Sequence, residues 1–365
     1  MAVGCVCAVD EWAVEEGRRA GAERQYECET VGAADEAITQ ILQMLDGIQS
    51  SIDPAGPNAA SLARLWWLMF YVCSAVFVLV MIALGLAIKK GTAKSDLNPV
   101  LNPSPKTETH KRNVVLSAVS VTTIILFVFL IASFSTGRSL TADIAQKNGL
   151  AIEITGYQWW WHVRYNDVDA SNIFTTANEI HIPTGVPVLF TLRSNDVIHS
   201  FWVPNLAGKK DLIPGKISTT WLQADKPGVY RGQCAEYCGL QHARMALWIV
   251  AEPPEQFNAW RQNQTQTSVP PATDSQRHGQ QVFLSSTCVM CHAINGTPAG
   301  SNFGPNLTHV GSRNTIAAAT LSNTRDHLAR WIMDSQQFKP GNKMPQNNLG
   351  QADLDALVDY LQSLK

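Results

Sequence analysis

The sequence predicts a multidomain membrane protein that begins with two transmembrane helices and continues as a β-sandwich and a small all-α domain. Two uncharged apolar runs, at residues 65–88 and 113–134, are each long enough to span a bilayer core as a helix. Short β-branched and aromatic runs separated by turn residues fill residues 150–250, a pattern typical of an antiparallel sandwich or barrel. Beyond residue 275, apolar residues recur at helical spacing.

Length, charge and cysteine content set the first limits on function. The 365 residues leave room for two or three domains, and the formal net charge of −2 gives no reason to expect nucleic-acid binding. Four of the eight cysteines form two tight pairs, each with a histidine close by. This spacing indicates metal and haem chemistry rather than a disulfide framework. The two pairs are Cys234 with Cys238 and Cys288 with Cys291.

Residues 1–50 form an acidic N-terminal extension. Residues 1–53 contain eleven Asp or Glu against three Arg, and apolar residues at helical spacing predict one short amphipathic helix there. No apolar core preceded by positive charge is present, so we do not identify a signal peptide. Either the true start lies downstream of Met1 or the extension is peculiar to the source organism. The helix would carry Ile38, Ile41, Leu42 and Leu45.

Residues 51–135 are expected to form a transmembrane hairpin. The connection between its two helices holds six Lys or Arg against Asp96 and Glu108. This excess of positive charge places the connection in the cytoplasm and everything after about residue 135 outside. Trp66 and Trp67 suit an anchor at the outer membrane interface. A buried soluble helix is the alternative, but a run of this length without a polar face is rare in globular cores.

Residues 136–252 are expected to fold as the β-sandwich. Its strands include residues 151–155, 179–183, 186–192 and 246–250. The run GYQWWW ends in three tryptophans, and strand periodicity would put Trp159 and Trp161 on one face and Trp160 on the other. Core or membrane-interface packing explains at least one of these rings. His162 and His181 lie on strand-like segments outside any ligand motif, so we interpret them as ordinary polar residues.

Residues 234–245, CAEYCGLQHARM, bring two thiols, an imidazole and a thioether together, and the segment DVIHSFWVP supplies a second imidazole. Thiolate and thioether sulfur beside imidazole selects copper. Two thiolates this close could bridge two metals, with an imidazole on each ion and the thioether as a weak ligand. A zinc knuckle or a disulfide is the alternative, but neither explains the methionine or DVIHSFWVP. The candidate ligands are His199, Cys234, Cys238, His242 and Met245.

A Gln/Thr/Pro-rich linker at 253–274, with a short helix around 254–262, leads to a C-terminal domain at 275–365. The motif CVMCH has the spacing with which Cys288 and Cys291 form thioethers to haem and His292 ligates the iron. Met290 and Met333 compete with Met344 for the sixth iron position, and we favour Met344. His309 and His327 are not expected to ligate iron.

The paired segments DVIHSFWVP and CAEYCGLQHARM, together with GYQWWW and CVMCH, resemble subunit II of cytochrome c oxidase, in the caa(3)-type with a fused class I cytochrome c. The resemblance covers residues 51–365. It implies a cupredoxin-like Greek-key sandwich, a binuclear Cu(A) centre, one covalent haem c, and His292 and Met344 as axial ligands. It adds the Glu236 carbonyl as a copper ligand and its carboxylate as a ligand for Mg or Mn at the interface with subunit I. It also makes Trp159 the exposed ring through which electrons enter from cytochrome c.

The same resemblance implies an inner-membrane subunit that works with subunits I and III, and with cytochrome c or another donor, in aerobic respiration. Oxygen reduction would occur in subunit I. It further implies that the Pro305 carbonyl orients His292, while Arg313 is either a haem propionate partner or an ordinary surface residue. An acid that opens the second helix in many relatives is absent, which leaves the proton-related role of Glu108 open. A quinol oxidase subunit II is excluded as an alternative, because it lacks the copper ligands that this sequence contains. A copper-delivery protein does not need Met245, Trp159 or the haem motif, and nitrous-oxide reductase lacks the paired membrane helices.

Overall fold

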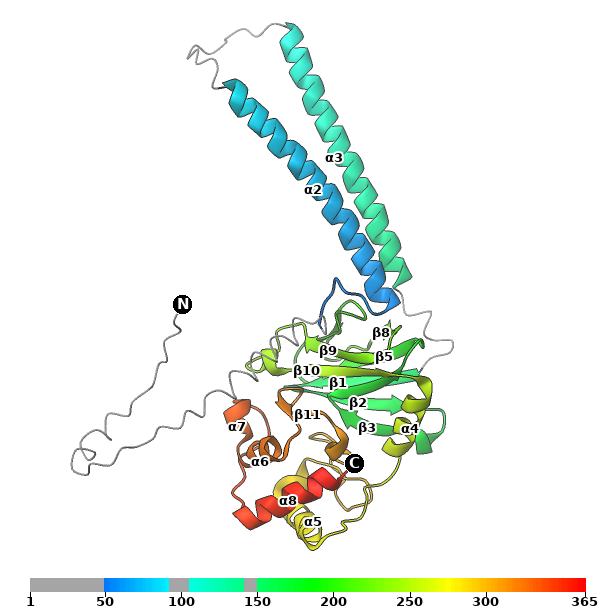
Figure 1. The fold of residues 1–365 in the computed structure, drawn as a ribbon, viewed down its shortest axis with the longest axis vertical. Coiled ribbons are helices and arrows are strands. Elements are labelled where there is room, and N and C mark those ends of the chain that lie inside the picture. Colours follow the sequence, from blue (N-terminus) through cyan, green and yellow to red (C-terminus); the bar gives the residue numbers. More distant parts are fainter. Residues whose placement is uncertain (1–48, 92–104, 141–149) are drawn as a thin grey trace, which may run out of the picture. The chain divides into compact units, whose positions relative to one another are not determined.

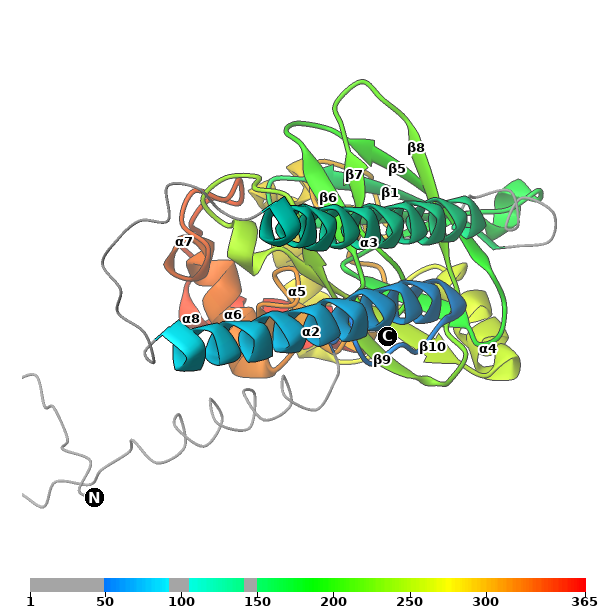
Figure 2. The same cartoon turned by 90° about the horizontal axis from the view of Figure 1, so that it is seen from above.

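The computed structural model describes residues 49–91, 105–140 and 150–365. The amphipathic helix expected within residues 1–50 lies outside the described residues. Helices α2 (Pro57–Gly91) and α3 (Pro105–Ser139) are both long and apolar enough to cross a membrane. Figures 1 and 2 show them as a pair of long helices lying side by side. Each extends beyond the predicted apolar run, because hydropathy detects only the part that needs lipid, whereas the helical backbone continues into the polar flanks.

The first turns of α2 are attached to the sandwich. Asn58 is buried and its side-chain amide donates to the carbonyl of Trp221 at 2.7 Å. The backbone N–H of Ala59 donates to the carbonyl of Leu206 at 3.2 Å, where it uses one of the donors that a helix N-terminus leaves without an internal partner. The membrane anchor and the sandwich are therefore joined by one side-chain and one main-chain hydrogen bond to carbonyls of the sandwich.

The sandwich consists of two five-stranded sheets, in the orders β3-β2-β1-β5-β8 and β4-β10-β9-β6-β7. Alternate residues of the strands face inward and form one apolar core, to which Ile154, Phe190 and Ile249 belong. The first sheet contains β1 (Leu150–Tyr157), β2 (Trp160–Asn166), β3 (Phe174–Ala177), β5 (Val188–Ser194) and β8 (Ser218–Leu222). The second contains β4 (Glu179–Pro183), β6 (His199–Trp202), β7 (Lys210–Leu212), β9 (Gly228–Cys234) and β10 (Ala246–Glu252).

Two strand pairs differ from the antiparallel arrangement that the sequence predicted. β1 pairs with β5 and β4 pairs with β10 in parallel, while the other pairs are antiparallel. Parallel neighbours arise because the chain crosses between the sheets before it returns beside an earlier strand. Trp159 and Trp161 share the sandwich core and Trp160 lies outside it, as predicted, but the three rings do not lie on one strand. Trp159 lies in the turn after β1, and only Trp160 and Trp161 belong to β2.

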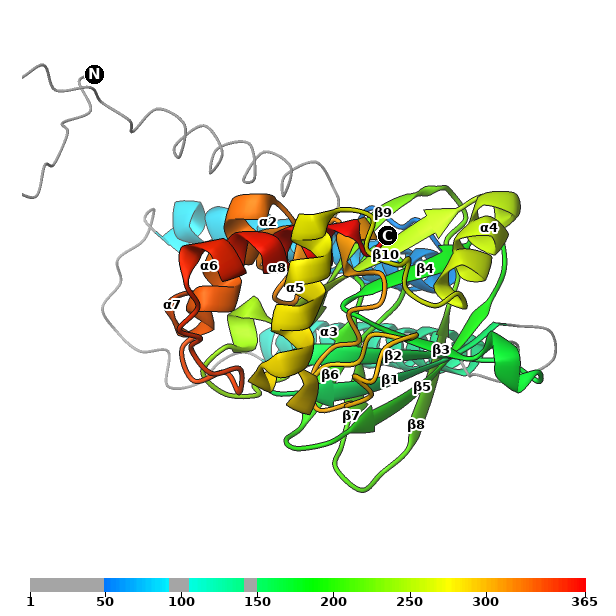
Figure 3. The same cartoon turned by 90° about the horizontal axis from the view of Figure 1, so that it is seen from below.

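The helix predicted around residues 254–262 is present as α4 (Pro254–Gln264), which packs Phe257 into the sandwich core. The chain then forms α5 (Asp274–Ser285), α6 (Arg325–Met333), α7 (Ser335–Phe338) and α8 (Gln351–Ser363). Helices α5 and α8 cross closely (Figure 3). The expected face of α8 is buried, with Leu354, Leu357, Val358 and Leu361 in the core. A two-residue ladder between β11 (Thr315–Ile316) and β12 (Leu321–Ser322) and an isolated bridge between Ala293 and Gly300 are the departures from an all-α domain among residues 274–365.

Candidate metal and haem centres

The second sheet brings the predicted copper ligands to one end of the sandwich. β9 ends at Cys234, β10 begins at Ala246, and the ligand loop connects them, as the sequence predicted. His199 is the first residue of β6, which pairs with β9 so that Phe201 lies opposite Cys234. Because neighbouring strands hold both ends of the set, residues far apart in the sequence converge on a rigid frame.

The side chains form one compact cluster. The two thiol sulfurs of Cys234 and Cys238 are 3.7 Å apart and both cysteines are free, so no disulfide joins them. Nδ1 of His199 lies 3.9 Å from Sγ of Cys234, and Nδ1 of His242 lies 3.5 Å from Sγ of Cys238. Sδ of Met245 is 3.8 Å from Sγ of Cys238. Each thiol thus has its own imidazole, and the thioether lies beside one of them.

Burial and charge favour metal binding at this cluster. His199, Cys234, Cys238 and Met245 are all buried. The hydrogen bond from the Cys238 thiol, together with that from His199, lowers the pKa of Cys234 to about 4 against the effect of burial. The pKa of Cys238 is raised, first because its thiol proton is shared with Cys234 and because the group is buried, and then because its own deprotonation would place a second charge beside Cys234. A cation at the centre relieves that repulsion, since thiolate is the form that binds metal. Among the described residues, His199, Cys234 and Cys238 form the group suited to hold a metal ion.

Two further features of the copper motif can be located. The Glu236 carbonyl lies 3.3 Å from Sγ of Cys234, so it faces the cluster. The Glu236 carboxylate points elsewhere and pairs with Lys209 at 3.5 Å. The main chain of Glu236 and its side chain therefore serve different neighbours.

Asp196 is a functional residue that sequence reasoning missed. Its Oδ1 lies 2.8 Å from Nε2 of His199, which leaves Nδ1 to face the cysteines. Its carboxylate also accepts from the backbone N–H groups of Gln158 and Val197. Burial raises the pKa of Asp196, but these hydrogen bonds together lower it by more, so the pKa is lower than its ordinary value. An acid three residues before a ligand histidine was the available signal.

Trp159 is not exposed as the resemblance implied; its exposed fraction is 7%. Its indole N–H donates to the carbonyl of Cys238 at 2.9 Å, which ties the ring to the ligand loop. A Cβ added at Gly341 would lie 3.8 Å from the ring, so the backbone of the C-terminal domain covers it. The expectation of exposure failed because the covering residues lie far along the chain, and contacts between distant segments leave no local signal in the sequence.

The haem motif forms the 3₁₀ turn Thr287–Met290 and the residues that follow it. Cys288 and Cys291 are free thiols. Nδ1 of His292 lies 2.7 Å from the Pro305 carbonyl, as expected, which makes Nε2 the candidate iron ligand. The carbonyl of Met344 accepts from Ser335 and Gln336 at 2.8 and 2.9 Å, and its N–H donates to Asn342. The ring of His292 and the main chain of Met344 are thus each fixed by hydrogen bonds.

Arg313 suits a haem propionate better than it suits open solvent. Burial lowers the pKa of its guanidinium to about 10, with Glu179 acting in the opposite direction. The guanidinium donates to the carbonyl of Asn306 at 2.6 Å. A partly buried cation favours an anionic partner, and haem would bring two carboxylates. The thiol pair, the histidine with one nitrogen free and this cation together fit the group.

Two histidines outside the copper and haem motifs have protein partners on both ring nitrogens. His181 is buried between Glu179 and Glu252 and stacks on Trp260 at 4.1 Å. His309 faces the carbonyls of Lys365 and Gln266.

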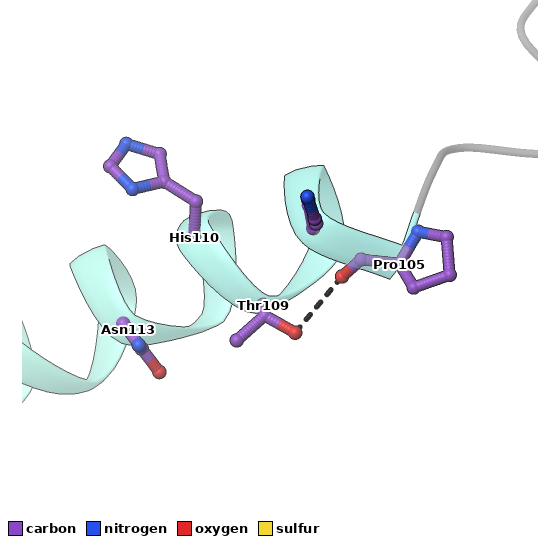
Figure 4. Close-up of a pocket in the computed structure, with 5 residues that line it drawn as sticks. Pro105, Thr109, His110 and Asn113 are labelled. Atoms are coloured by element: carbon purple, nitrogen blue, oxygen red, sulfur yellow. Dashed lines mark hydrogen bonds between the residues drawn. The ribbon is translucent and has the colours of Figure 1, made fainter.

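A shallow hollow at the start of α3 is lined by residues of one helix face, among them Thr109 and His110 (Figure 4). Thr109 bonds back to the Pro105 carbonyl there at 2.9 Å, so this hollow is a feature of the helix terminus.

Comparison with known proteins agrees with this arrangement. The family "Cytochrome C oxidase subunit II, periplasmic domain" matches residues 169–252, and the family "Cytochrome c" matches residues 276–365. Cytochrome c oxidase subunit 2 of Alkalihalophilus pseudofirmus is 35% identical over 87% of this chain and 91% of its own length. The protein of the same name from Bacillus sp. strain PS3 is 31% identical over 70% and 75%. The periplasmic domain of subunit II of cytochrome oxidase (CoxB) of Bradyrhizobium japonicum is 31% identical, with a TM-score of 0.31, over 33% of this chain and 96% of that one.

Proposed function

The chain belongs to the cytochrome c oxidase subunit II family, and we propose that it accepts electrons from cytochrome c through a fused haem c and a binuclear Cu(A) centre and passes them to subunit I. Subunit I would then reduce oxygen to water in aerobic respiration. The two-pass membrane anchor and the C-terminal cytochrome c domain are part of the family assignment. The bacterial inner membrane, with both centres on its outer side, is the location that we propose from the positive charge between the helices.

The observation that carries this proposal is the distance of 3.7 Å between the sulfurs of Cys234 and Cys238, each with its own imidazole. Two soft thiolates are more than a single copper needs, whereas a copper pair can use both as bridges. We propose His199, Cys234, Cys238, His242, Met245 and the Glu236 carbonyl as the ligands. When bound, the copper pair and the haem each take up and release one electron with little rearrangement of their surroundings.

The protein contributes position and exclusion of water. Asp196 fixes the ring of His199, and the Pro305 carbonyl fixes that of His292. Cys288 and Cys291 would hold the haem covalently, and His292 and Met344 would be its axial ligands. His/Met ligation raises the iron potential, which suits electron transfer to copper. The Trp159 ring, bonded to the Cys238 carbonyl, is the group that we propose for electron entrance to the copper centre.

The remaining partners follow from the family as proposals. Subunit I, and with it subunit III, would contact this chain, and the donor would be cytochrome c or another small electron carrier. On assembly with subunit I, the Glu236 carboxylate would exchange its contact with Lys209 for a Mg or Mn ion. We propose domain boundaries at 51–135 for the hairpin, 136–252 for the copper domain, 253–274 for the linker and 275–365 for the haem domain.

Metal analysis and EPR spectroscopy of the purified full-length subunit test the proposal. We expect about two coppers per chain, a hyperfine pattern of one electron shared by two copper ions, and one covalent haem. Cys238→Ser should convert the signal to that of a single copper, whereas Cys73→Ser, on the membrane helix, should leave it unchanged. One copper with a localised electron in the unaltered chain, or zinc in its place, would replace the electron-relay function with copper delivery.

A further inference from the structure

A buried lysine lies where the C-terminal domain meets the copper domain. Lys339 follows α7 and is only 3% exposed. Its Nζ donates to the carbonyl of Trp159 at 2.7 Å, to that of Arg244 at 2.9 Å, and to that of Ala317 at 3.2 Å. Two of these acceptors belong to the copper domain and the third to the haem domain. One side-chain nitrogen thus donates hydrogen bonds to main-chain carbonyls of three separate segments.

The acceptors are the segments on which the two redox centres depend. Trp159 carries the ring bonded to the Cys238 carbonyl. Arg244 lies in the ligand loop between His242 and Met245. Lys339 itself begins the stretch 339–344, which ends at the proposed iron ligand Met344. The nitrogen therefore connects the haem-ligand loop to the copper-ligand loop. Lys339 is close in sequence to Met344, and its acceptor Arg244 directly precedes Met245.

On the haem-domain side of this contact the backbone has a strained conformation. Ala317, Ala318 and Ala319 have φ values of 56°, 59° and 58°, a left-handed region that residues with a Cβ rarely occupy. The buried Ala318 accepts the N–H of Ala246, the first residue of β10, at 3.3 Å. Such strain persists only where the surroundings determine it, and here both Ala317 and Ala318 give their carbonyls to the interface.

Other bonds surround this contact. The side chain of Gln241 donates to the Pro340 carbonyl at 2.8 Å, and Arg244 donates to the Phe338 carbonyl. At the rim, Lys343 lies 3.9 Å from Asp196 and its side chain is 70% exposed. A buried nitrogen with three acceptors is fixed in position, whereas an exposed ion pair contributes little. Lys339 is therefore the centre of the interface and Lys343 is part of its edge.

We propose that Lys339 is a positioning residue that fastens the haem-ligand loop to Trp159 and the copper-ligand loop, so that electrons pass between the two centres at one fixed separation without a docking step. The inference rests on the proposed function, because it assigns the path between the proposed centres. As an ammonium the nitrogen has one N–H for each of the three carbonyls, and as an amine it keeps two of these donors, so the contact depends mainly on its position among the carbonyls. Covering Trp159 also directs any external donor to the haem rather than to the copper domain.

The test compares Lys339→Met with Lys343→Met in the full-length subunit within the assembled oxidase. Both variants remove one lysine from the same loop, but only the first loses buried donors. After flash reduction of haem c, we expect Lys339→Met to slow electron transfer to Cu(A) about tenfold or more, because a tethered but undocked domain must find its position each time. Lys343→Met should stay within about twofold. Lys339→Arg, which keeps several donors, should recover part of the rate.

Two further readouts separate positioning from other effects. The midpoint potentials of both centres should stay the same in Lys339→Met, and the Ala246 N–H should exchange faster with deuterium. An unchanged rate with unchanged exchange, or a slower rate explained by a shifted potential, would overturn the inference. If Lys339→Met does not assemble, the unaltered chain still decides, because an Ala246 N–H that exchanges like a free loop means that the domains are not docked. Absence of the Cu(A) or haem signal in the unaltered chain would instead refute the proposed function.

Discussion

Nε2 of His199 lies 2.8 Å from Oδ1 of Asp196, and this contact determines which ring nitrogen faces the cysteines. Because Asp196 also accepts two backbone N–H groups, its carboxylate cannot turn away without leaving them unpaired. The histidine is therefore held in one tautomer and one orientation before any metal arrives. Mutation of such outer partners of metal ligands typically weakens metal binding by about tenfold to a hundredfold.

We expect Asp196→Asn to weaken copper binding by on the order of tenfold to a hundredfold, because the amide keeps the shape but loses the charge that orients the imidazole. The measurement is the copper retained per chain against a graded series of a competing chelator. Glu153→Gln is the control, since Glu153 forms an ion pair with the largely exposed Arg193 on β5, away from the cluster. Equal retention by the two variants would contradict the role given to Asp196.

Gly156 lies against the His199 ring, where there is no space for a side chain. A Cβ at this position would lie 2.8 Å from Cδ2 of His199, closer than real contacts allow. Gly156→Ala should therefore displace the imidazole, lower the copper content, and reduce the free energy of unfolding by about 1–3 kcal/mol. Gly300→Ala is the matched control because its added Cβ meets open space. Titration with denaturant and copper analysis measure the two effects, and full copper loading of Gly156→Ala would refute the argument.

Met344→His should lower the midpoint potential of haem c by an appreciable part of the roughly 0.8 V that axial ligands span. The thioether favours reduced iron, whereas a second imidazole favours oxidised iron. Redox titration of the full chain measures the shift. Met333→Leu, a change in α6 against the haem-domain core, should leave the potential unchanged and cost less than about 1.5 kcal/mol of stability. If Met333→Leu shifts the potential and Met344→His does not, Met333 is the ligand.

The local patterns in the sequence were sufficient for the membrane helices, for several strands and for the segments that supply the proposed ligands. Apolar runs revealed both membrane helices, the spacing of Cys234, Cys238, His242 and Met245 revealed the ligand loop, and the Pro305 contact with His292 followed from the family. Contacts between distant segments were not encoded in any local period. Nothing in the sequence marks Lys339 as a buried interface residue, because its acceptors are main-chain carbonyls 22 to 180 positions away. Every residue has such a carbonyl, so no residue type identifies the acceptors. The burial of Trp159 was missed for the same reason.

The Lys339 environment also predicts how docking depends on pH. Burial, with Arg244 acting in the same direction, lowers the pKa of Lys339 to about 7 from an ordinary value of 10.5 in the undocked chain. Between these two values the undocked lysine holds a proton that the docked lysine has released. Docking therefore releases a proton in this window and becomes more favourable as pH rises from 7 toward 10, by up to about tenfold per pH unit. Below pH 7 both states are protonated and the dependence should disappear.

Deuterium exchange at the Ala246 N–H, corrected for the intrinsic pH dependence of exchange, measures this docking equilibrium because its acceptor is the Ala318 carbonyl across the interface. We expect its protection to increase between pH 7 and 9 in the unaltered chain and to be independent of pH in Lys339→Met. The N–H of Val250, which belongs to the β9–β10 ladder within the copper domain, should show no such trend in either chain. Protection at Ala246 that falls with rising pH would mean that the docked lysine holds its proton more tightly than the undocked one, and that the three carbonyls outweigh its burial.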